Sequence, residues 1–158
     1  MINVLFVCLG NICRSPMAEG IFGERLKQSG MQHLVQYDSA GTANYHTGSL
    51  PDKRAMKVCT ENKIELTHRA RQVSLSDFDT FDFIVAMDSS NLSDLQNVKP
   101  DSAKARLVLI TSYALNTGYP EVPDPYYGGI EGFHEVFQLL ERCIDNLLEH
   151  LKQTIQEK

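Results

Sequence analysis

The sequence of 158 residues lacks the features that mark a membrane, secreted or nucleic-acid-binding protein. Its longest apolar run, residues 4–9, is far shorter than the roughly 18 residues that a membrane span needs. No cation precedes Arg14 to begin a signal peptide, so we expect neither membrane insertion nor secretion. The net charge of −5 argues against a broad basic surface, and nucleic acid is therefore not an expected partner.

Cysteine is also scarce, and its spacing excludes two common kinds of site. The four cysteines form no C-x-x-C pair, so neither a structural zinc site nor a thioredoxin-type motif is expected. A chain of this length needs no disulfide framework, and without an export signal we expect a cytoplasmic protein with free thiols. A special cysteine in that compartment is more often catalytic or redox-sensing. The cysteines are Cys8, Cys13, Cys59 and Cys143.

The remaining composition is that of an ordinary folded domain. Hydrophobic residues make up 42% and charged residues 22% of the chain, with no repeat or linker, so we interpret residues 1–158 as a single domain. Apolar runs alternate with helical patterns, which predicts an α/β fold with a doubly wound, four-stranded parallel sheet flanked by helices. The expected strands are residues 2–8, 34–39, 81–87 and 106–110, and the expected helices begin at Ser15, near Pro51 and at Ser89, with a last helix over residues 133–155.

Two features of the later chain bear on function. Cys59 and Cys143 fall on the apolar faces of expected helices, so we interpret both as small core residues. Residues 113–129 contain three prolines, three glycines and four tyrosines, and form the one long irregular segment that we expect. Long loops inside compact domains are often functional, so we expect this loop to contribute to a site.

The strongest candidate for a functional site is the junction between the first strand and the first helix. Cys8 ends the strand and Ser15 opens the helix, and in an open α/β sheet ligands bind where strand carboxyl ends meet helix amino ends. The backbone N–H groups of residues 9–14 can turn inward, and the helix dipole adds positive potential, so the segment can bind a tetrahedral oxyanion without a metal. The residues expected to bind the anion are Leu9, Gly10, Asn11, Ile12, Cys13, Arg14 and Ser15.

The side chains of this junction suit nucleophilic chemistry. A thiol surrounded by amide donors at a helix N-terminus ionises readily, so we expect Cys8 to be a thiolate at neutral pH and to attack phosphorus. Arg14 can hold two equatorial oxygens at once with its planar guanidinium. The hydroxyl of Ser15 can donate to the Cys8 sulfur, with a purely structural N-cap as the alternative. Asn11 tolerates left-handed backbone geometry, and its amide can hold the loop to its neighbours.

Residues 7–16, Val-Cys-Leu-Gly-Asn-Ile-Cys-Arg-Ser-Pro, closely resemble the phosphate loop of the low-molecular-weight protein tyrosine phosphatases. Residues 38–42, 68–71, 87–92 and 124–128 look like landmarks of the same family, in its order and at its approximate spacings. The resemblance covers essentially the whole chain. It implies one low-molecular-weight phosphatase domain with a flavodoxin-like fold of the phosphotyrosine phosphatase I type, in agreement with the sheet predicted above.

The resemblance also implies an activity, the hydrolysis of phosphotyrosine in proteins or peptides, and of aryl phosphates, through a phosphocysteine intermediate. Expelling an unprotonated phenoxide from phosphorus is slow, and the resemblance assigns the role of general acid to Asp124, between Pro123 and Pro125. Without the resemblance, a turn aspartate is the preferred interpretation. In a second step Asp124 activates water to hydrolyse the phosphocysteine. No metal or cofactor is required, and phosphate, sulfate or vanadate is expected to occupy the loop.

Supporting roles follow from the family by position. Asn11, Ser39 and His68 are expected to form a hydrogen-bonded network that holds the loop, and Ser15 supports the same site. A solvent-facing His68 is the alternative. Aromatic side chains are expected to sandwich the phenyl ring of the substrate in a deep cleft. The residues expected to line this pocket are Leu9, Ile12, Tyr45, Tyr126 and Tyr127.

Substrate preference and regulation depend on single positions. The family's arginine phosphatases usually carry threonine where this chain has Ile12, which favours phosphotyrosine as the substrate. Cys13 is a candidate for a reversible disulfide with Cys8 that protects the nucleophile, and packing beneath the loop is the alternative. Tyr126 and Tyr127 resemble sites that are phosphorylated in some relatives. We expect a monomer.

Two other functions compete with this prediction. A thioredoxin-coupled arsenate reductase shares the loop and the fold, but its chemistry relays through a further pair of cysteines in a mobile segment. Cys59 and Cys143 are instead far apart and lie in expected helices. A non-catalytic phosphate- or phosphotyrosine-binding module would lack either Cys8 or Asp124, and this chain has both. Tyrosine phosphatase is therefore the preferred prediction.

Overall fold

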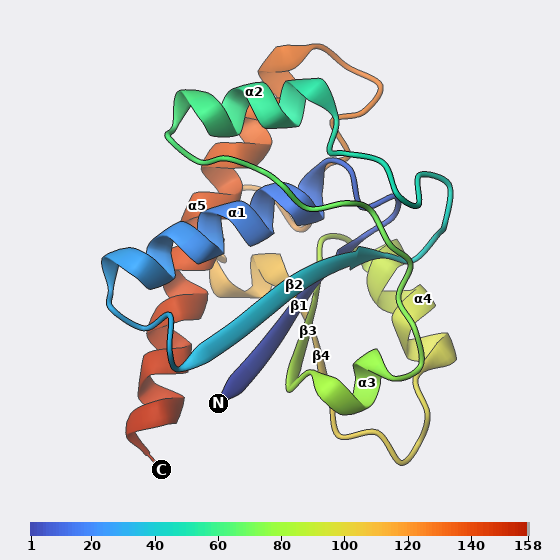
Figure 1. Cartoon of the computed structure of the whole chain (residues 1–158), viewed down its shortest axis with the longest axis vertical. Helices are drawn as coiled ribbons and strands as arrows, with labels where there is room; N and C mark the ends of the chain where they lie inside the picture. Colours follow the sequence, from blue (N-terminus) through green and yellow to red (C-terminus); the bar gives the residue numbers. More distant parts are fainter. Residues whose placement is uncertain (158) are drawn as a thin grey trace.

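A parallel sheet forms the centre of the computed structural model, which describes residues 1–157. Its strands lie in the spatial order β2-β1-β3-β4, and neighbouring strands all pair in parallel (Figure 1). The predicted doubly wound, four-stranded sheet is therefore confirmed. The chain moves from β1 to β2 on one side and to β3 and β4 on the other, and ligands bind at such a reversal. The strands are β1 (Ile2–Cys8), β2 (Val35–Gly41), β3 (Phe83–Ala86) and β4 (Arg106–Leu109).

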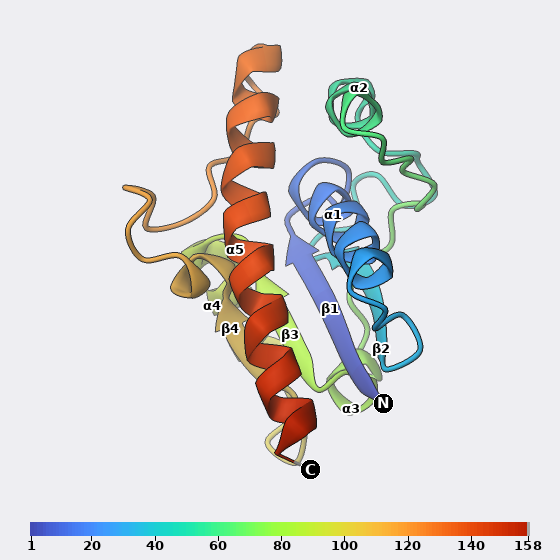
Figure 2. The same cartoon turned by 90° about the vertical axis from the view of Figure 1, so that its left-hand side faces the viewer.

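Helices cover both faces of the sheet (Figure 1). Helices α1 and α5 pack together on one face with α2 against both of them, and α3 and α4 lie on the other face. Figure 2 shows that α5 runs from one end of the molecule to the other. The helices are α1 (Arg14–Gln28), α2 (Lys53–Glu61), α3 (Asp77–Thr80), α4 (Ser89–Val98) and α5 (Ile130–Gln156), and a 3₁₀ helix η1 (Ile110–Tyr113) follows β4.

Strand β1 lies between two hydrophobic clusters. Val4 and Phe6 belong to the cluster beneath α1 and α5, whereas Leu5 and Val7 belong to the cluster on the opposite face. Because side chains alternate along a strand and both faces of this one are covered, an almost entirely apolar sequence is required here. The burial of both faces holds the end of β1, and with it Cys8, in a fixed position.

Most element boundaries agree with the sequence, and the differences have local causes. Strand β1 has the predicted bounds, and helix α4 begins at the predicted residue, Ser89. Strand β3 starts later than predicted because the N–H of Phe81 donates to the carbonyl of Asp77, which makes Phe81 the end of α3. Strand β4 ends before Ile110 because η1 begins there. Neither α3 nor η1 is predicted by the sequence pattern.

One predicted helix cap is wrong. Helix α1 begins at Arg14, with Cys13 in the N-cap position and no side-chain hydrogen bond to cap it. Ser15 therefore lies inside the first turn, and its hydroxyl is directed to the Cys8 sulfur, 3.0 Å away. Because no side chain within residues 1–157 caps the start of α1, the first N–H groups of the helix stay unpaired beside the loop that precedes it.

The two remaining cysteines lie where the sequence predicts, and so does the apolar character of the helices. Cys59 in α2 and Cys143 in α5 are fully buried and unpaired, which confirms their interpretation as core residues. In residues 1–157, no helix combines the length and the apolar character needed to cross a membrane.

Candidate active site

The loop between β1 and α1 is built to expose its backbone N–H groups. Its carbonyls accept hydrogen bonds from outside the loop: Leu9 from Ala43 N–H at 3.0 Å, and Ile12 from Asp52 N–H at 2.8 Å. In the described part of the chain, the N–H groups of residues 9–14 donate to no protein atom. Carbonyls that face outward and N–H groups without protein acceptors are the arrangement of an anion-binding nest at a helix N-terminus.

Asn11 determines the shape of this loop. Its φ of 58° is left-handed, as predicted. Its side-chain amide donates to the hydroxyls of Ser15 at 2.8 Å and Ser39 at 3.0 Å. Its Oδ1 accepts from His68 Nε2 at 2.8 Å and from the backbone N–H of Arg71 at 3.0 Å. All four hydrogen-bonding positions of the buried amide are thus used, and the expected network is present in the structure.

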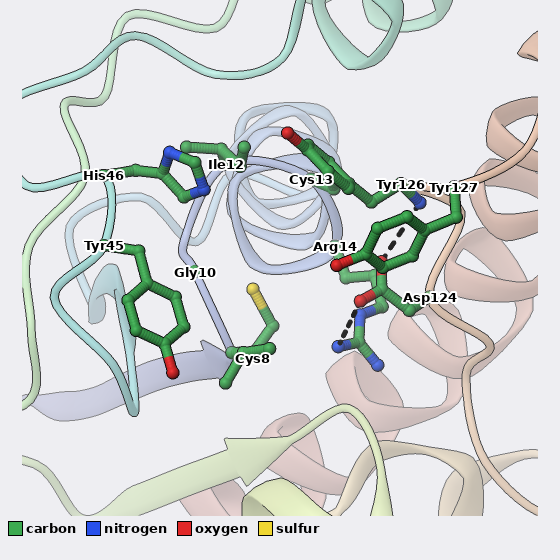
Figure 3. Close-up of a pocket in the computed structure, with 11 residues that line it drawn as sticks. Cys8, Gly10, Ile12, Cys13, Arg14, Tyr45, His46, Asp124, Tyr126 and Tyr127 are labelled. Atoms are coloured by element: carbon green, nitrogen blue, oxygen red, sulfur yellow. Dashed lines mark hydrogen bonds and ion pairs between the residues drawn. The ribbon is translucent and has the colours of Figure 1, made fainter.

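Cys8 lies at the base of the loop, with its side chain directed into the pocket (Figure 3). It is 3% exposed, and Ser15 Oγ is 3.0 Å from its sulfur. Because Asn11 already donates to Ser15 Oγ, the hydroxyl hydrogen of Ser15 can point at the sulfur, and the carbonyl of Ala40, at 3.4 Å, is its more distant alternative acceptor. A thiolate at this position is therefore stabilised by a hydroxyl donor and faces the unpaired N–H groups of the loop.

Arg14 is a buried cation held by Asp88, an acidic partner that was not among the predicted site residues. Its Nη1 pairs with Asp88 Oδ2 at 2.6 Å and donates to the carbonyl of Val122 at 3.1 Å. Burial opposes the charge on Arg14, but Cys8 and Asp88 outweigh it and raise the pKa of the guanidinium. Asp88 also caps α4 through Asn91. The cap uses only Oδ1 of Asp88, which leaves Oδ2 to pair with Arg14. A capping aspartate directly after a strand was therefore the sequence signal that could have pointed to this residue.

Asp124 reaches the same pocket from the long loop before α5 (Figure 3). Its Oδ2 is 3.7 Å from Arg14 Nη2, and the side chain is 37% exposed. Its Oδ1 accepts from the backbone N–H of Tyr126 at 3.1 Å. The two interpretations of Asp124, as a turn residue and as a general acid, are therefore compatible. One carboxylate oxygen holds a turn, and the other faces the anion-binding loop.

The pocket has a volume of about 100 Å³ and is lined by the expected residues together with one that was not predicted. Tyr45 and Tyr127 are 73% and 91% exposed, so they stand at the rim as walls rather than in the interior. His46 also lines the pocket, 6.3 Å from Tyr126 between ring centroids. No helix or strand pattern surrounds His46, which explains why sequence reasoning missed it. The lining residues are Cys8, Leu9, Gly10, Ile12, Cys13, Arg14, Tyr45, His46, Asp124, Tyr126 and Tyr127.

Behind the loop, His68 lies between two carboxylates. Its Nδ1 is 3.2 Å from Glu19 and 3.4 Å from Asp38. Burial raises the pKa of Glu19 to about 7, and burial also lowers the pKa of His68 against the opposing effect of Asp38. The Nδ1 atom and the Glu19 carboxyl are close enough to share one proton. This geometry excludes the alternative of a solvent-facing His68.

The same three side chains are the one group in residues 1–157 whose ligand atoms lie close enough to hold a metal, all within 4.8 Å of one another. Glu19 already accepts from Ser39 Oγ at 2.7 Å, and His68 is bonded to Asn11. Since these hydrogen bonds support the loop directly, we interpret the cluster as part of the supporting network.

Cys13 lies beside the pocket but differs from Cys8 in its surroundings. Burial, with Asp52 and Cys8 adding to it, raises the pKa of the Cys13 thiol far above its ordinary value. Both cysteines are free thiols in the structure. A reversible disulfide between them stays a prediction.

A thiol at the base of an anion-binding loop, facing an arginine and a carboxylic acid, is typical of cysteine-dependent phosphoryl-transfer enzymes. The sequence model of the family "Low molecular weight phosphotyrosine protein phosphatase" matches residues 3–157. A protein of that name from Schizosaccharomyces pombe is 44% identical over 151 residues, which are 95% of this chain and 97% of the relative. The chain therefore belongs to the low-molecular-weight phosphotyrosine protein phosphatases, and it is an enzyme of that cysteine-based type.

Solved structures agree with this family. A protein tyrosine phosphatase from Entamoeba histolytica, with Hepes in its active site, has a TM-score of 0.94 and 38% identity, covering 98% of this chain and 99% of that chain. A Drosophila arginine phosphatase has a TM-score of 0.90 and 33% identity, covering 94% of this chain and 97% of that chain. Proteins of this fold thus include enzymes named for two different phosphorylated side chains.

Proposed function

We propose that in this phosphatase Cys8 is the nucleophile, Arg14 binds the transferring phosphoryl group and Asp124 is the general acid and base. One observation carries the proposal: the three side chains converge on a single pocket, Cys8 and Arg14 from the two ends of the loop between β1 and α1 and Asp124 from the loop before α5. The loop residues from Leu9 to Ser15 supply the backbone donors for the phosphate oxygens. Ser39 and His68 support the loop through Asn11.

The reaction has two steps. In the first, the Cys8 thiolate forms a bond to phosphorus while the bond to the aryl oxygen breaks, and Asp124 donates its proton to that oxygen. In the second, the Asp124 carboxylate accepts a proton from water, whose oxygen attacks the phosphocysteine and releases phosphate and the thiolate. Ser15, 3.0 Å from the sulfur, stabilises the thiolate as it leaves. Because Asp88 holds one side of Arg14, the other side is directed to two equatorial oxygens.

The proposed substrate is phosphotyrosine in a protein or peptide. Tyr45, Tyr126 and Tyr127 offer aromatic faces around the opening, which suit the ring of a phosphotyrosine. Ile12 adds an apolar side chain to the lining of the pocket, at the position where the family's arginine phosphatases usually carry threonine. The competing functions have no support of this kind. In particular, Cys59 and Cys143 are buried in α2 and α5, away from any relay that an arsenate reductase needs.

The test is phosphate release from a phosphotyrosine peptide by wild-type, Cys8→Ser and Asp124→Ala protein, with a metal chelator present. We expect Cys8→Ser to abolish turnover and Asp124→Ala to reduce it about a hundredfold or more. Vanadate is expected to compete with the peptide for the loop. Phosphoserine and phosphoarginine peptides are the controls. Turnover of phosphoarginine alone would contradict the substrate, and binding without hydrolysis would contradict the mechanism.

The proposal extends to the setting of the enzyme. Free buried thiols and the charge of −5 are compatible with a cytoplasmic monomer that needs no metal or cofactor. Tyr127 is exposed enough for a modifying enzyme to reach it, as is part of Tyr126, so phosphorylation of this pair stays a prediction.

A further inference from the structure

Arg54, in the first turn of α2, connects three parts of the molecule. Its Nε and Nη2 donate to the two carboxylate oxygens of Asp52, at 3.0 and 2.9 Å. Its Nη1 and Nη2 also donate to the carbonyls of Gly128 at 2.7 Å and Tyr126 at 2.9 Å. Below the guanidinium lies the ring of Phe133, with 4.5 Å between the Cζ atom and the ring centroid. The planar group is thus fixed at its edge by hydrogen bonds and at its face by an aromatic ring.

One end of this arrangement is the phosphate loop. Asp52 is the N-cap of α2, and its backbone N–H donates to the carbonyl of Ile12 at 2.8 Å. Asp52 therefore joins Arg54 to the loop that surrounds Cys8. The hydrogen bonds of Arg54 lower the pKa of the Asp52 carboxyl, so the anchor keeps its negative charge.

The other end is the loop that carries the proposed general acid, residues 124–129. The backbone N–H of Tyr126 donates to Asp124 Oδ1, and the carbonyl of the same residue accepts from Arg54. In the described part of the chain, Arg54 and the first turn of α5 are the only donors of hydrogen bonds from outside to these six residues. Arg14 holds the chain just before Asp124, through the carbonyl of Val122, whereas Arg54 holds the residues just after it to α2.

We propose that Arg54 is a positioning residue for Asp124, acting with Asp52 to hold the acid loop at a set distance from the phosphate loop. This inference rests on the proposed function. A general acid must lie within hydrogen-bond reach of the leaving oxygen, and small displacements from that position reduce the rate strongly. Arg54 does not touch the reacting atoms, so its removal affects the proton transfer and leaves the thiolate and Arg14 in place.

The experiment compares two substrates that differ in their need for a proton. Phenyl phosphate expels a basic phenoxide, whereas p-nitrophenyl phosphate expels a far less basic one. We expect Arg54→Met to lower kcat/KM about tenfold or more for phenyl phosphate and about threefold or less for p-nitrophenyl phosphate. Arg54→Lys, which cannot donate in two directions from a plane, is expected to fall between wild type and Arg54→Met. Equal losses for both substrates would overturn the proposal.

Two controls separate positioning from general damage. Arg25→Met removes an arginine that pairs with Glu141 and Asp145 between α1 and α5, remote from the pocket, and should change neither value of kcat/KM. In an Asp124→Ala background, Arg54→Met should cause less than about a twofold further change in the ratio of the two substrates, because the group it positions is absent. An undiminished change there would contradict the proposal.

Failure of this inference differs from failure of the proposed function. If Asp124→Ala itself does not discriminate between the two substrates, the general acid is misassigned. If Asp124→Ala discriminates and Arg54→Met does not, only the role of Arg54 is wrong. Asp52→Asn is the second variant in case Arg54→Met does not fold, since asparagine keeps the helix cap but removes the anchoring charge. It should discriminate in the same direction as Arg54→Met, and the opposite direction would overturn the proposal.

Discussion

At the scale of single residues, the site depends on buried polar groups that satisfy one another. Asn11 uses all its hydrogen-bonding positions, and Arg14 is a nearly buried cation paired with one carboxylate. Removing one partner of such a pair leaves the other buried and unpaired, which costs more than the pair contributes. The residues that surround the phosphate loop are therefore sensitive to changes that conserve shape but not charge.

Asp88→Asn tests this sensitivity. Asparagine is as good an N-cap as aspartate, so α4 keeps its cap, but the charge opposite Arg14 is lost. We expect the free energy of unfolding to fall by about 2–4 kcal/mol and kcat/KM for a phosphotyrosine peptide to fall at least about tenfold. Urea unfolding and initial rates measure the two effects.

The matched control is Asp145→Asn, which removes an exposed partner of Arg25. Its effect on stability should stay below about 1 kcal/mol, because exposed ion pairs contribute little. Equal effects of the two substitutions would show that Arg14 does not depend on Asp88.

At the scale of elements, the end of β2 and the phosphate loop approach each other so closely that only glycine fits. A Cβ on Gly41 would lie 2.6 Å from the carbonyl oxygen of Leu9 and 3.2 Å from the backbone nitrogen of Asn11. Both neighbours are backbone atoms of the loop, which cannot turn away as a flexible side chain does. The absence of a side chain at Gly41 therefore allows the end of β2 to pack directly against the backbone of the loop.

Gly41→Ala is expected to displace the phosphate loop. Overpacking against backbone should lower the free energy of unfolding by about 2 kcal/mol, and the shifted N–H groups should lower kcat/KM at least about tenfold. Urea unfolding and turnover of the phosphotyrosine peptide are the measurements.

Gly132→Ala, in the first turn of α5, is the control. Its Cβ would meet Pro125 at 3.6 Å, an ordinary contact. Because alanine favours helix over glycine, we expect unchanged activity and a stability equal to wild type or higher by up to about 1 kcal/mol. Similar losses for both glycines would contradict the close approach of β2 to the loop.

At the scale of the whole molecule, the core buries thiols that stay protonated. Burial raises the pKa of Cys59 to about 12 and the pKa of Cys143 to about 11. The unfolded chain releases these protons near pH 9, whereas the folded protein keeps them. The unfolded state therefore binds fewer protons above that pH, so the stability that each thiol contributes is present below pH 9 and is lost as pH rises toward 11–12.

Cys59→Ala should remove the part of the alkaline decrease in the free energy of unfolding that comes from this thiol. Between pH 8 and pH 10, the difference in free energy of unfolding between wild type and Cys59→Ala should shrink by about 1 kcal/mol. Val58→Ala removes buried volume from the same helix without a titrating group, and its deficit should not change with pH. Urea unfolding at several pH values measures both, and a constant deficit for Cys59→Ala would contradict the raised pKa.

Much of the fold and of the site was predictable because its signals are local. The apolar run of β1, the cysteine at its end and the helical spacing of α5 are each read from neighbouring residues. The prediction that Ser15 caps α1 was wrong because it, too, used only local information. Sequence shows a residue type that suits a cap, but the position of the Cys8 sulfur decides where the hydroxyl points.

The sequence by itself determined the alternation of strands and helices, the anion-binding loop and its family. Short-range periodicity and a continuous motif carry that information within about ten residues of each position. Only the tertiary structure decided which distant residues complete the site: Asp88 beside Arg14, Glu19 beside His68, and Arg54 beneath the acid loop. Those partners lie 74, 49 and 72 positions apart along the chain, and the packing of helices on a twisted sheet brings them together. No local pattern encodes such a contact, because its energy arises only when both groups are buried side by side.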